Sequence, residues 1–146
     1  MTRLTHNLSL LSTLCFTLSH SAIADNELNT SLTNAIHETP YSAVLKYTKV
    51  DVVEEEHDDK HIYHAQVVET FRGETHDNIE FVGYFEKGEK TELDTNPVIV
   101  TLCLDNGIYY WPGTGAQFPA NPETMALSHQ TALDIDSKQT EFVQCP

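Results

Sequence analysis

The chain has 146 residues and a formal net charge of −14 at pH 7, because 22 acidic residues outnumber eight lysines and arginines. A length of this order corresponds to one domain. Phosphate backbones and anionic lipid surfaces attract cationic proteins, so this charge argues against nucleic acid and anionic membranes as partners. Cationic proteins or metal ions suit it better.

The first 24 residues have the pattern of a secretory signal peptide. Arg3 gives a basic start, and a largely apolar stretch follows from Leu8 to Leu18. Ala22 and Ala24 then make the small-x-small pattern that signal peptidase accepts. The stretch is shorter than the roughly 20 apolar residues of a transmembrane helix. We therefore expect cleavage between Ala24 and Asp25 and a secreted or periplasmic protein.

The mature part, residues 25–146, is expected to be a single domain that does not insert into a membrane. Removal of the signal peptide takes away Arg3 and no acid, so seven basic residues remain against 22 acidic ones, a formal −15. Cys103 and Cys145 also remain, and two cysteines in an exported domain indicate one disulfide. The enclosed loop of roughly 40 residues corresponds to about 4 kcal/mol of stabilisation in the chain-entropy model.

The mature domain is predicted to begin with little regular structure. Asp25 to Thr30 is polar and typical of a loose leader. Leu32 to His37 has apolar residues at helical spacing, which predicts a short helix that Pro40 ends. From Tyr41 onward, stretches rich in β-branched and aromatic residues alternate in polarity, which predicts strands.

These predicted strands cover residues 43–53, 62–71, 78–85, 97–104 and 108–111. In the first of them, one face is predicted to carry Val44, Lys46, Thr48, Val50 and Val52. The fourth is nearly all apolar, which indicates a central strand buried on both faces. The triplet Asp105-Asn106-Gly107 that follows it is a strong hairpin signal.

The C-terminal part is predicted to contain one helix and one more strand. Asn121, Pro122 and Glu123 have the chemistry of a helix N-cap and its first two positions, and the helix is expected to last to His129. Residues 141–144 would form a last strand that carries Cys145 back to the sheet. Five or six short strands with few helices predict a small barrel or sandwich.

One run of motifs is more specific. Val67 to Gly73 has the sequence V-V-E-T-F-R-G, and Ile79 and Phe81 follow it. A Lys87–Glu89 turn then leads into the apolar stretch Val98–Leu102. From residue 41 to residue 104 this order resembles the netrin-like module, which the tissue inhibitors of metalloproteinases share with many bacterial exported proteins. The resemblance implies a mainly β fold, a small five- to six-stranded OB-like barrel with one or two short helices.

The start of the mature chain differs from that of the tissue inhibitors. Their mature chain begins with a cysteine whose amine and carbonyl chelate the zinc of the protease. This chain would begin at Asp25-Asn26, with no cysteine near it. Eukaryotic netrin-like modules also carry several disulfides and are often basic. The resemblance therefore implies the fold and not protease inhibition.

Residues 54–64 form the most conspicuous cluster of candidate metal ligands. They include five carboxylates and three imidazoles, those of His57, His61 and His64, and these donors suit zinc, copper or nickel. If His61 and His64 lie on one strand, however, their odd separation places them on opposite faces. The alternative is a solvated hairpin tip whose charges protect a sheet edge. We expect no cofactor, with weak binding of a transition metal as the alternative.

Catalytic motifs are absent from the sequence. It contains no G-x-S-x-G elbow, no H-E-x-x-H pair and no glycine-rich phosphate cradle followed by lysine. We therefore expect a non-enzymatic protein. A small hydrolase whose site forms only in the tertiary structure is a further alternative.

A run of aromatic residues leads into a loop rich in glycine and proline. The candidate binding surface consists of Tyr109, Tyr110, Trp111 and Phe118. Tyrosine and tryptophan are enriched in binding surfaces, although alternate residues of a short strand also fill a core. On a strand, Tyr110 points away from Tyr109 and Trp111. The sequence thus favours an exported binding module for another protein, with a periplasmic metal-binding protein that uses residues 54–64 as the alternative.

Overall fold

The computed structural model describes residues 20–91, 93–113, 115–135 and 137–145. Most of the predicted signal peptide, residues 1–19, lies outside these ranges. The elements are α1 (His20–His37), β1 (Tyr41–Glu54), β2 (Asp58–Arg72), β3 (Asn78–Glu86), β4 (Val98–Asp105), β5 (Ile108–Tyr110), β6 (Gln117–Pro119) and α2 (Pro122–Asp134). No helix in the described ranges is long and apolar enough to cross a membrane.

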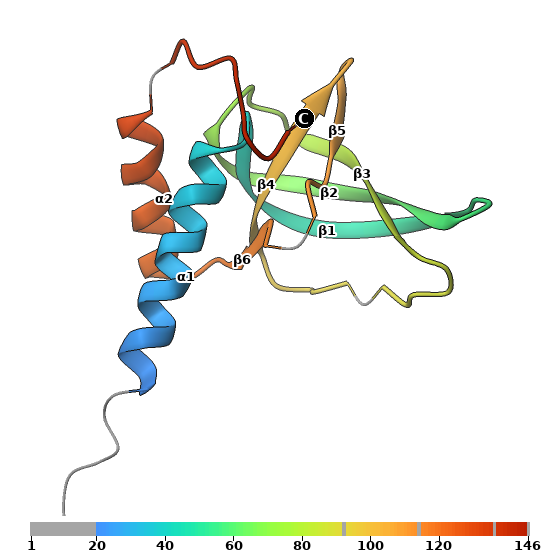
Figure 1. Cartoon of the computed structure of the whole chain (residues 1–146), viewed down its shortest axis with the longest axis horizontal. Coiled ribbons are helices and arrows are strands. Elements are labelled where there is room, and N and C mark those ends of the chain that lie inside the picture. The colour runs from blue at the N-terminus through green and yellow to red at the C-terminus, as the bar shows by residue number, and fades with distance from the viewer. Residues whose placement is uncertain (1–19, 92, 114, 136, 146) are drawn as a thin grey trace, which may run out of the picture.

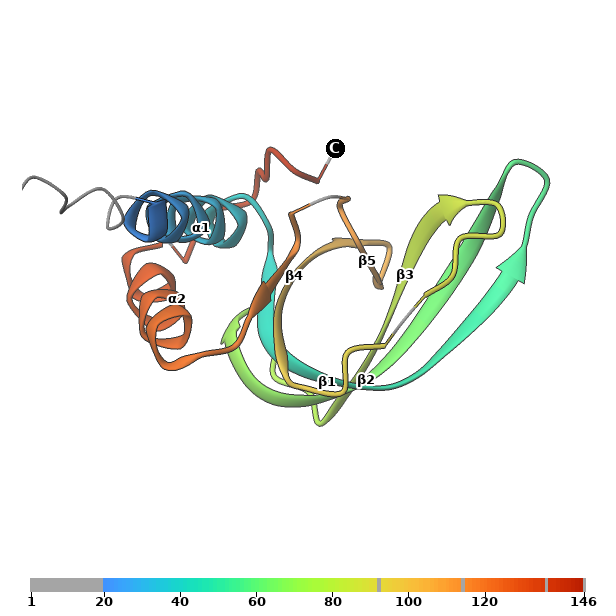
Figure 2. The same cartoon turned by 90° about the horizontal axis from the view of Figure 1, so that it is seen from below.

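Five strands close into a barrel. Their order is β1-β2-β3-β5-β4, and β4 pairs with β1 to complete the ring. All neighbours are antiparallel except β3 and β5, which run parallel, and β6 adds a short strand beside β4. Figure 2 shows the strands curling around a common centre, with both helices on one side. The prediction of a mainly β, OB-like barrel with two helices is confirmed.

The barrel interior is filled by side chains from every long strand. Aromatic rings dominate it, and Tyr63 stacks on Phe81 at a ring distance of 4.9 Å. The buried interior residues are Tyr41, Ala43, Leu45, Tyr47, Tyr63, Ala65, Ile79, Phe81, Val98, Val100 and Leu102. Alternation along each strand places these side chains inside, because successive residues of a strand point to opposite faces.

A second core lies between the barrel wall and the two helices, which pack side by side (Figure 1). Its buried residues are Leu32, Ala35, Ile36, Val44, Ile99 and Phe118. Strand β4 therefore has the barrel interior on one side and the helices on the other. This explains why Val98 to Cys103 are all buried, and it confirms the prediction that this strand is buried on both faces.

Strand β1 differs from its predicted face. Up to Tyr47 the odd-numbered residues point inward, and a register shift between Tyr47 and Lys49 then moves Val50 to the inside. Val44, predicted to share a face with Val50, faces the helices instead. The physical reason is a β-bulge, which inserts one residue and reverses the alternation beyond it.

Several predicted boundaries were wrong. Residues 25–30 are not a loose leader, because α1 runs through them, and Asn29 Nδ2 donates a hydrogen bond of 2.9 Å to Glu123 Oε1 at the start of α2. Helix α2 continues five residues beyond His129, to Asp134. Residues 141–144 form no strand, and β2 begins at Asp58, so that the charged turn is shorter than expected.

The predicted hairpin turn at Asn106-Gly107 and the predicted helix start at Asn121 are both confirmed. Asn106 and Gly107 both have positive φ, 49° and 83°, which is the two-residue hairpin geometry that favours an Asn-Gly pair. At the start of α2, Asn121 Oδ1 accepts hydrogen bonds of 3.0 Å from the backbone amides of Glu123 and Thr124. Local chemistry alone determines both features.

The C-terminal segment is attached to the barrel at two points. Cys145 forms a disulfide with Cys103 of β4, with their Cα atoms 5.5 Å apart. Arg72, at the end of β2, donates to the carbonyl of Ile36 at 2.8 Å and to Gln139 Oε1 at 3.0 Å. It thereby satisfies a free carbonyl at the C-terminus of α1, where a cation is favourable. Arg72 thus joins the end of β2 to α1 and to the C-terminal segment.

Candidate functional site

The four residues of the predicted binding surface separate into different surroundings. Tyr109 points into the barrel, where its ring lies 4.8 Å from that of Tyr41. Phe118 is buried against the helices. Trp111 is half-buried at one end of the barrel, with its ring 5.9 Å from that of Phe81. Only Tyr110 among the four lies on the outside of the barrel wall, so the prediction of one continuous surface was wrong for Tyr109 and Phe118.

Tyr110 belongs to an apolar area that covers the outside of three strands. In the sheet register Tyr110 pairs with Val82 of β3, and Val82 pairs with Ile62 of β2. Tyr84 and Ile108, close by, are 59% and 58% exposed. We call this surface the outer patch and define it by Lys60, Ile62, Val82, Tyr84, Ile108 and Tyr110.

The outer patch contains a shallow hollow of about 280 Å³. Lys60 lines it from β2, Asp105 from the end of β4 and Asn106 from the β4–β5 turn. Tyr84 and Ile108 were not predicted as part of a binding surface. The sequence could have predicted the exposure of Tyr84, because the alternation expected for residues 78–85 points Val82 and Tyr84 away from the core.

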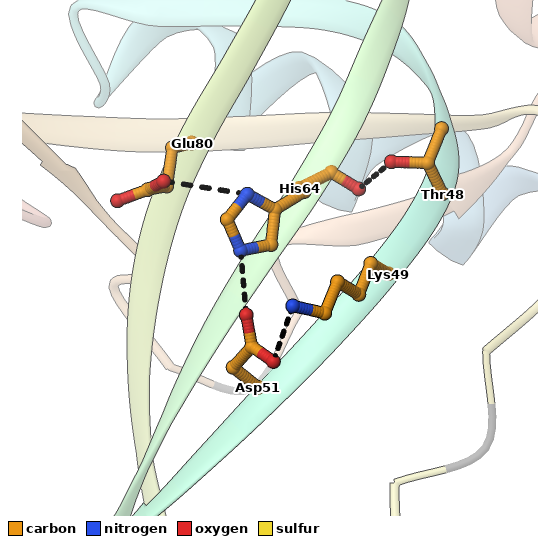
Figure 3. Close-up of polar contacts among 5 residues, drawn as sticks. All are labelled: Thr48, Lys49, Asp51, His64 and Glu80. Carbon is orange, nitrogen blue, oxygen red and sulfur yellow. Dashed lines mark hydrogen bonds and ion pairs between the residues drawn. The ribbon is translucent and has the colours of Figure 1, made fainter.

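A polar network lies next to the outer patch, because His64 pairs with Glu80 two residues along from the pair of Ile62 and Val82. Figure 3 shows its side chains. His64 Nε2 lies 3.0 Å from Asp51 Oδ2, and His64 Nδ1 lies 3.3 Å from Glu80 Oε2. Lys49 Nζ contacts the other oxygen of Asp51 at 2.7 Å. The hydrogen bond from Lys49, followed by that from His64, holds the pKa of Asp51 below its ordinary value. The side chains of Lys49, Asp51, His64 and Glu80 thus each have a polar partner within the network.

The three candidate metal ligands do not come together. His57 is exposed at the tip of the β1–β2 hairpin, and His64 takes part in the outer network. His61 is fully buried inside the barrel, where its Nδ1 lies 2.6 Å from Thr91 Oγ1 and its ring stacks on Phe85 at 4.4 Å. Within the described ranges, no group of three or more His, Cys, Asp and Glu residues is arranged to hold a metal ion.

A larger cavity, of about 480 Å³, opens at the end of the barrel where Trp111 lies. We call it the mouth cavity. Its lining comes from β3, from the turn after it and from the loop between β5 and β6: Gly83, Tyr84, Phe85, Glu86, Glu89, Trp111, Gly113, Gly115 and Gln117. Its volume falls within the range typical of small-molecule sites.

Close packing holds the walls of the mouth cavity in place. A Cβ atom at Gly83 would lie 2.7 Å from Phe85 Cε2, so only glycine leaves room for this ring. Trp111 Nε1 donates a hydrogen bond to the carbonyl of Gly113. Gln117 Oε1 accepts one of 2.8 Å from the hydroxyl of Tyr47. Trp111 and its loop were predicted from the sequence as a binding element, but the part of the wall that β3 supplies was not.

Comparison with protein families, with curated proteins and with solved structures found no match to this chain. The function of the protein therefore has to be inferred from its fold and from the geometry of these surfaces.

Proposed function

We propose that this protein is an exported, non-enzymatic binding module of the netrin-like OB type that contacts another protein through its outer patch. The observation that carries this proposal is the exposure of Tyr84 and Ile108 beside Tyr110 on a single face. Tyrosine anchors of this kind dominate the binding energy of many interfaces. Scattered apolar residues are ordinary on a surface, but a group of this kind marks an interaction site.

The position of the outer patch within the barrel supports the same function. In OB-type barrels the face of strands β2 and β3, with the β1–β2 and β4–β5 loops, is where oligonucleotides and oligosaccharides bind, so the analogy supports the place of binding and not the class of partner. Lys60 and Tyr84 lie on that face, and Asp105 ends β4 directly before the β4–β5 turn. This support is an analogy at the level of the fold.

The charges around the outer patch indicate the chemistry of the partner. Glu80 and Asp105 are exposed at its border, and the whole chain carries a formal charge of −14. Complementary potentials favour a partner with apolar side chains at its centre and basic ones around them. A nucleic acid or an anionic membrane would be repelled.

The test is a pull-down from the envelope of the source cells, followed by measurement of the affinity for the partner identified. Tyr110→Ala and Tyr84→Ala are each expected to weaken binding by about 2 kcal/mol, or roughly 30-fold. Val68→Ala is the matched control, because Val68 is 57% exposed on β2 but lies outside the outer patch. Circular dichroism checks that each variant is folded.

Unchanged affinity in both folded tyrosine variants would contradict the proposal. If Tyr110→Ala fails to fold, Tyr84→Ala still decides the question, because the more exposed Tyr84 contributes less to the core.

A further inference from the structure

The mouth cavity combines aromatic walls with acidic groups. Trp111 and Phe85 line it, and Tyr84 lies at its rim. Glu86 and Glu89 line it as well, and neither carboxylate forms an ion pair within the described part of the chain. The lysines of the same turn, at positions 87 and 90, are not among the lining residues. The charge that faces the cavity is therefore negative.

A buried acid lies behind this wall. Asp59 pairs with Phe85 in the β2–β3 register and is only 4% exposed. Its Oδ2 accepts a hydrogen bond of 2.8 Å from the backbone amide of Gly88, which holds the turn over the barrel end. Its Oδ1 is buried, and no described residue donates a hydrogen bond to it. Asp59 does not itself line the cavity; its hydrogen bond to Gly88 anchors the turn that carries Glu89.

These features suit one class of ligand. A cation is attracted to the face of an aromatic ring, and most strongly to that of tryptophan. An alkylated ammonium group adds apolar surface that the rings can cover, and nearby carboxylates complete the attraction. We propose that the mouth cavity binds a small organic cation of the alkylated-ammonium class between Trp111, Phe85 and the carboxylates of Glu86 and Glu89.

This site differs from the outer patch. Its wall is built from the end of β3, the turn after it and the β5–β6 loop, and of the six residues that define the patch only Tyr84 lines it. The close approach of Phe85 to Gly83 and the stacking of Phe85 on His61 fix the part of the wall that β3 supplies. A cavity formed in advance costs little ordering on binding, which suits a small molecule.

Trp111 is the only tryptophan in the sequence, so the intrinsic fluorescence of the purified protein reports directly on the cavity. The probe is choline, and its uncharged carbon isostere 3,3-dimethyl-1-butanol is the matched control. Choline is expected to change the fluorescence saturably, and the isostere to bind about tenfold more weakly, since the cation–π and carboxylate contributions require the charge. Calorimetry measures the same two affinities independently of the fluorophore.

Two variants test the assignment of residues. Glu89→Gln is expected to weaken choline binding several-fold, whereas Glu141→Gln, which removes the same charge from the exposed C-terminal segment, leaves it unchanged. Trp111→Leu is expected to abolish binding in calorimetry.

The proposal is overturned if choline and its isostere bind equally, or if neither fluorescence nor calorimetry detects choline at millimolar concentrations. Glu89→Gln is expected to leave capture of the protein partner unchanged. The experiments can therefore refute the proposal for the mouth cavity without refuting the proposal for the outer patch, and the reverse.

Discussion

His61 and His64 lie three residues apart in strand β2 and point to opposite faces of the barrel wall. His61 is enclosed in the interior beside Thr91, and His64 lies outside between Asp51 and Glu80. An odd separation has this result in a strand that no bulge interrupts, and β2 is regular between these two residues. The two imidazoles therefore cannot bind the same metal ion, although the sequence places them in one cluster with His57.

Zinc binding is accordingly predicted to be weak. Calorimetry with zinc should give an affinity no tighter than micromolar, because a tight site needs four ligands in tetrahedral geometry. His57→Ala is expected to change this affinity little, since His57 stands alone at the hairpin tip. A stoichiometric zinc ion that survives dialysis against a chelator would contradict the prediction and would support a metal-binding function.

The Cys103–Cys145 disulfide is predicted to contribute substantially to stability. It closes a loop with a sequence separation of 42 residues, which corresponds to about 4 kcal/mol in the chain-entropy model. Urea unfolding of the oxidised and the reduced protein should differ by roughly this free energy, and free-thiol labelling of the unfolded, unreduced protein should find almost no thiol. Using the reduced protein avoids the cavity that Cys103→Ala would create in the core. A loss below about 1 kcal/mol would contradict the prediction.

Gly73 is predicted to be the glycine least tolerant of substitution among those with positive φ. Its φ is +93°, and a Cβ atom would lie 2.7 Å from Tyr41 Cδ2. Gly88 has a similar φ of +78° but would meet nothing within 4 Å. Both alanine variants lose about 1 kcal/mol to the backbone conformation, and Gly73→Ala should lose about 1–3 kcal/mol more through the clash. Equal losses in denaturant unfolding would show that Tyr41 moves aside at no cost.

Alkaline pH is predicted to destabilise the fold through Tyr41. Burial raises the pKa of Tyr41 from its ordinary value of 10.0 to about 12. Between these values the unfolded chain has released a proton that the folded chain retains, so the free energy of unfolding falls as the pH rises from about 10 to about 12. Below pH 10 the contribution of this group to stability is fully present.

The check is denaturant unfolding of Tyr41→Phe, which keeps the ring and removes the titrating hydroxyl. Between about pH 9 and about pH 11, the free energy of unfolding of this variant should fall by about 1.4 kcal/mol less than that of the wild type. Tyr84→Phe provides the control for removal of a tyrosine hydroxyl at an exposed position. Parallel pH profiles for wild type and Tyr41→Phe would refute the assignment.

Much of the fold follows from local pattern. The strands were predicted from alternation of period two, and the turn at Asn106-Gly107 and the helix start at Asn121 from chemistry within a few residues. Helix α1 was predicted too short, because residues 25–30 carry little apolar signal and their packing depends on α2, almost a hundred residues later. The bulge after Tyr47 also escaped prediction, because one inserted residue has no local signature in an alternating strand.

In the candidate sites, too, local pattern predicts some features and only the tertiary structure decides others. The sequence alone determined that Tyr110 points away from Tyr109, because successive residues of a strand face opposite ways. It did not determine that Tyr84 lies near Tyr110, since β3 and β5 become neighbours only when the barrel closes with a parallel pair. The mouth cavity likewise depends on that pairing, because Trp111 is held beside β3 by a hydrogen bond of 2.7 Å from its backbone amide to the carbonyl of Val82. Such contacts join segments distant in the chain, and the free energy of packing the whole barrel decides them, which no local pattern encodes.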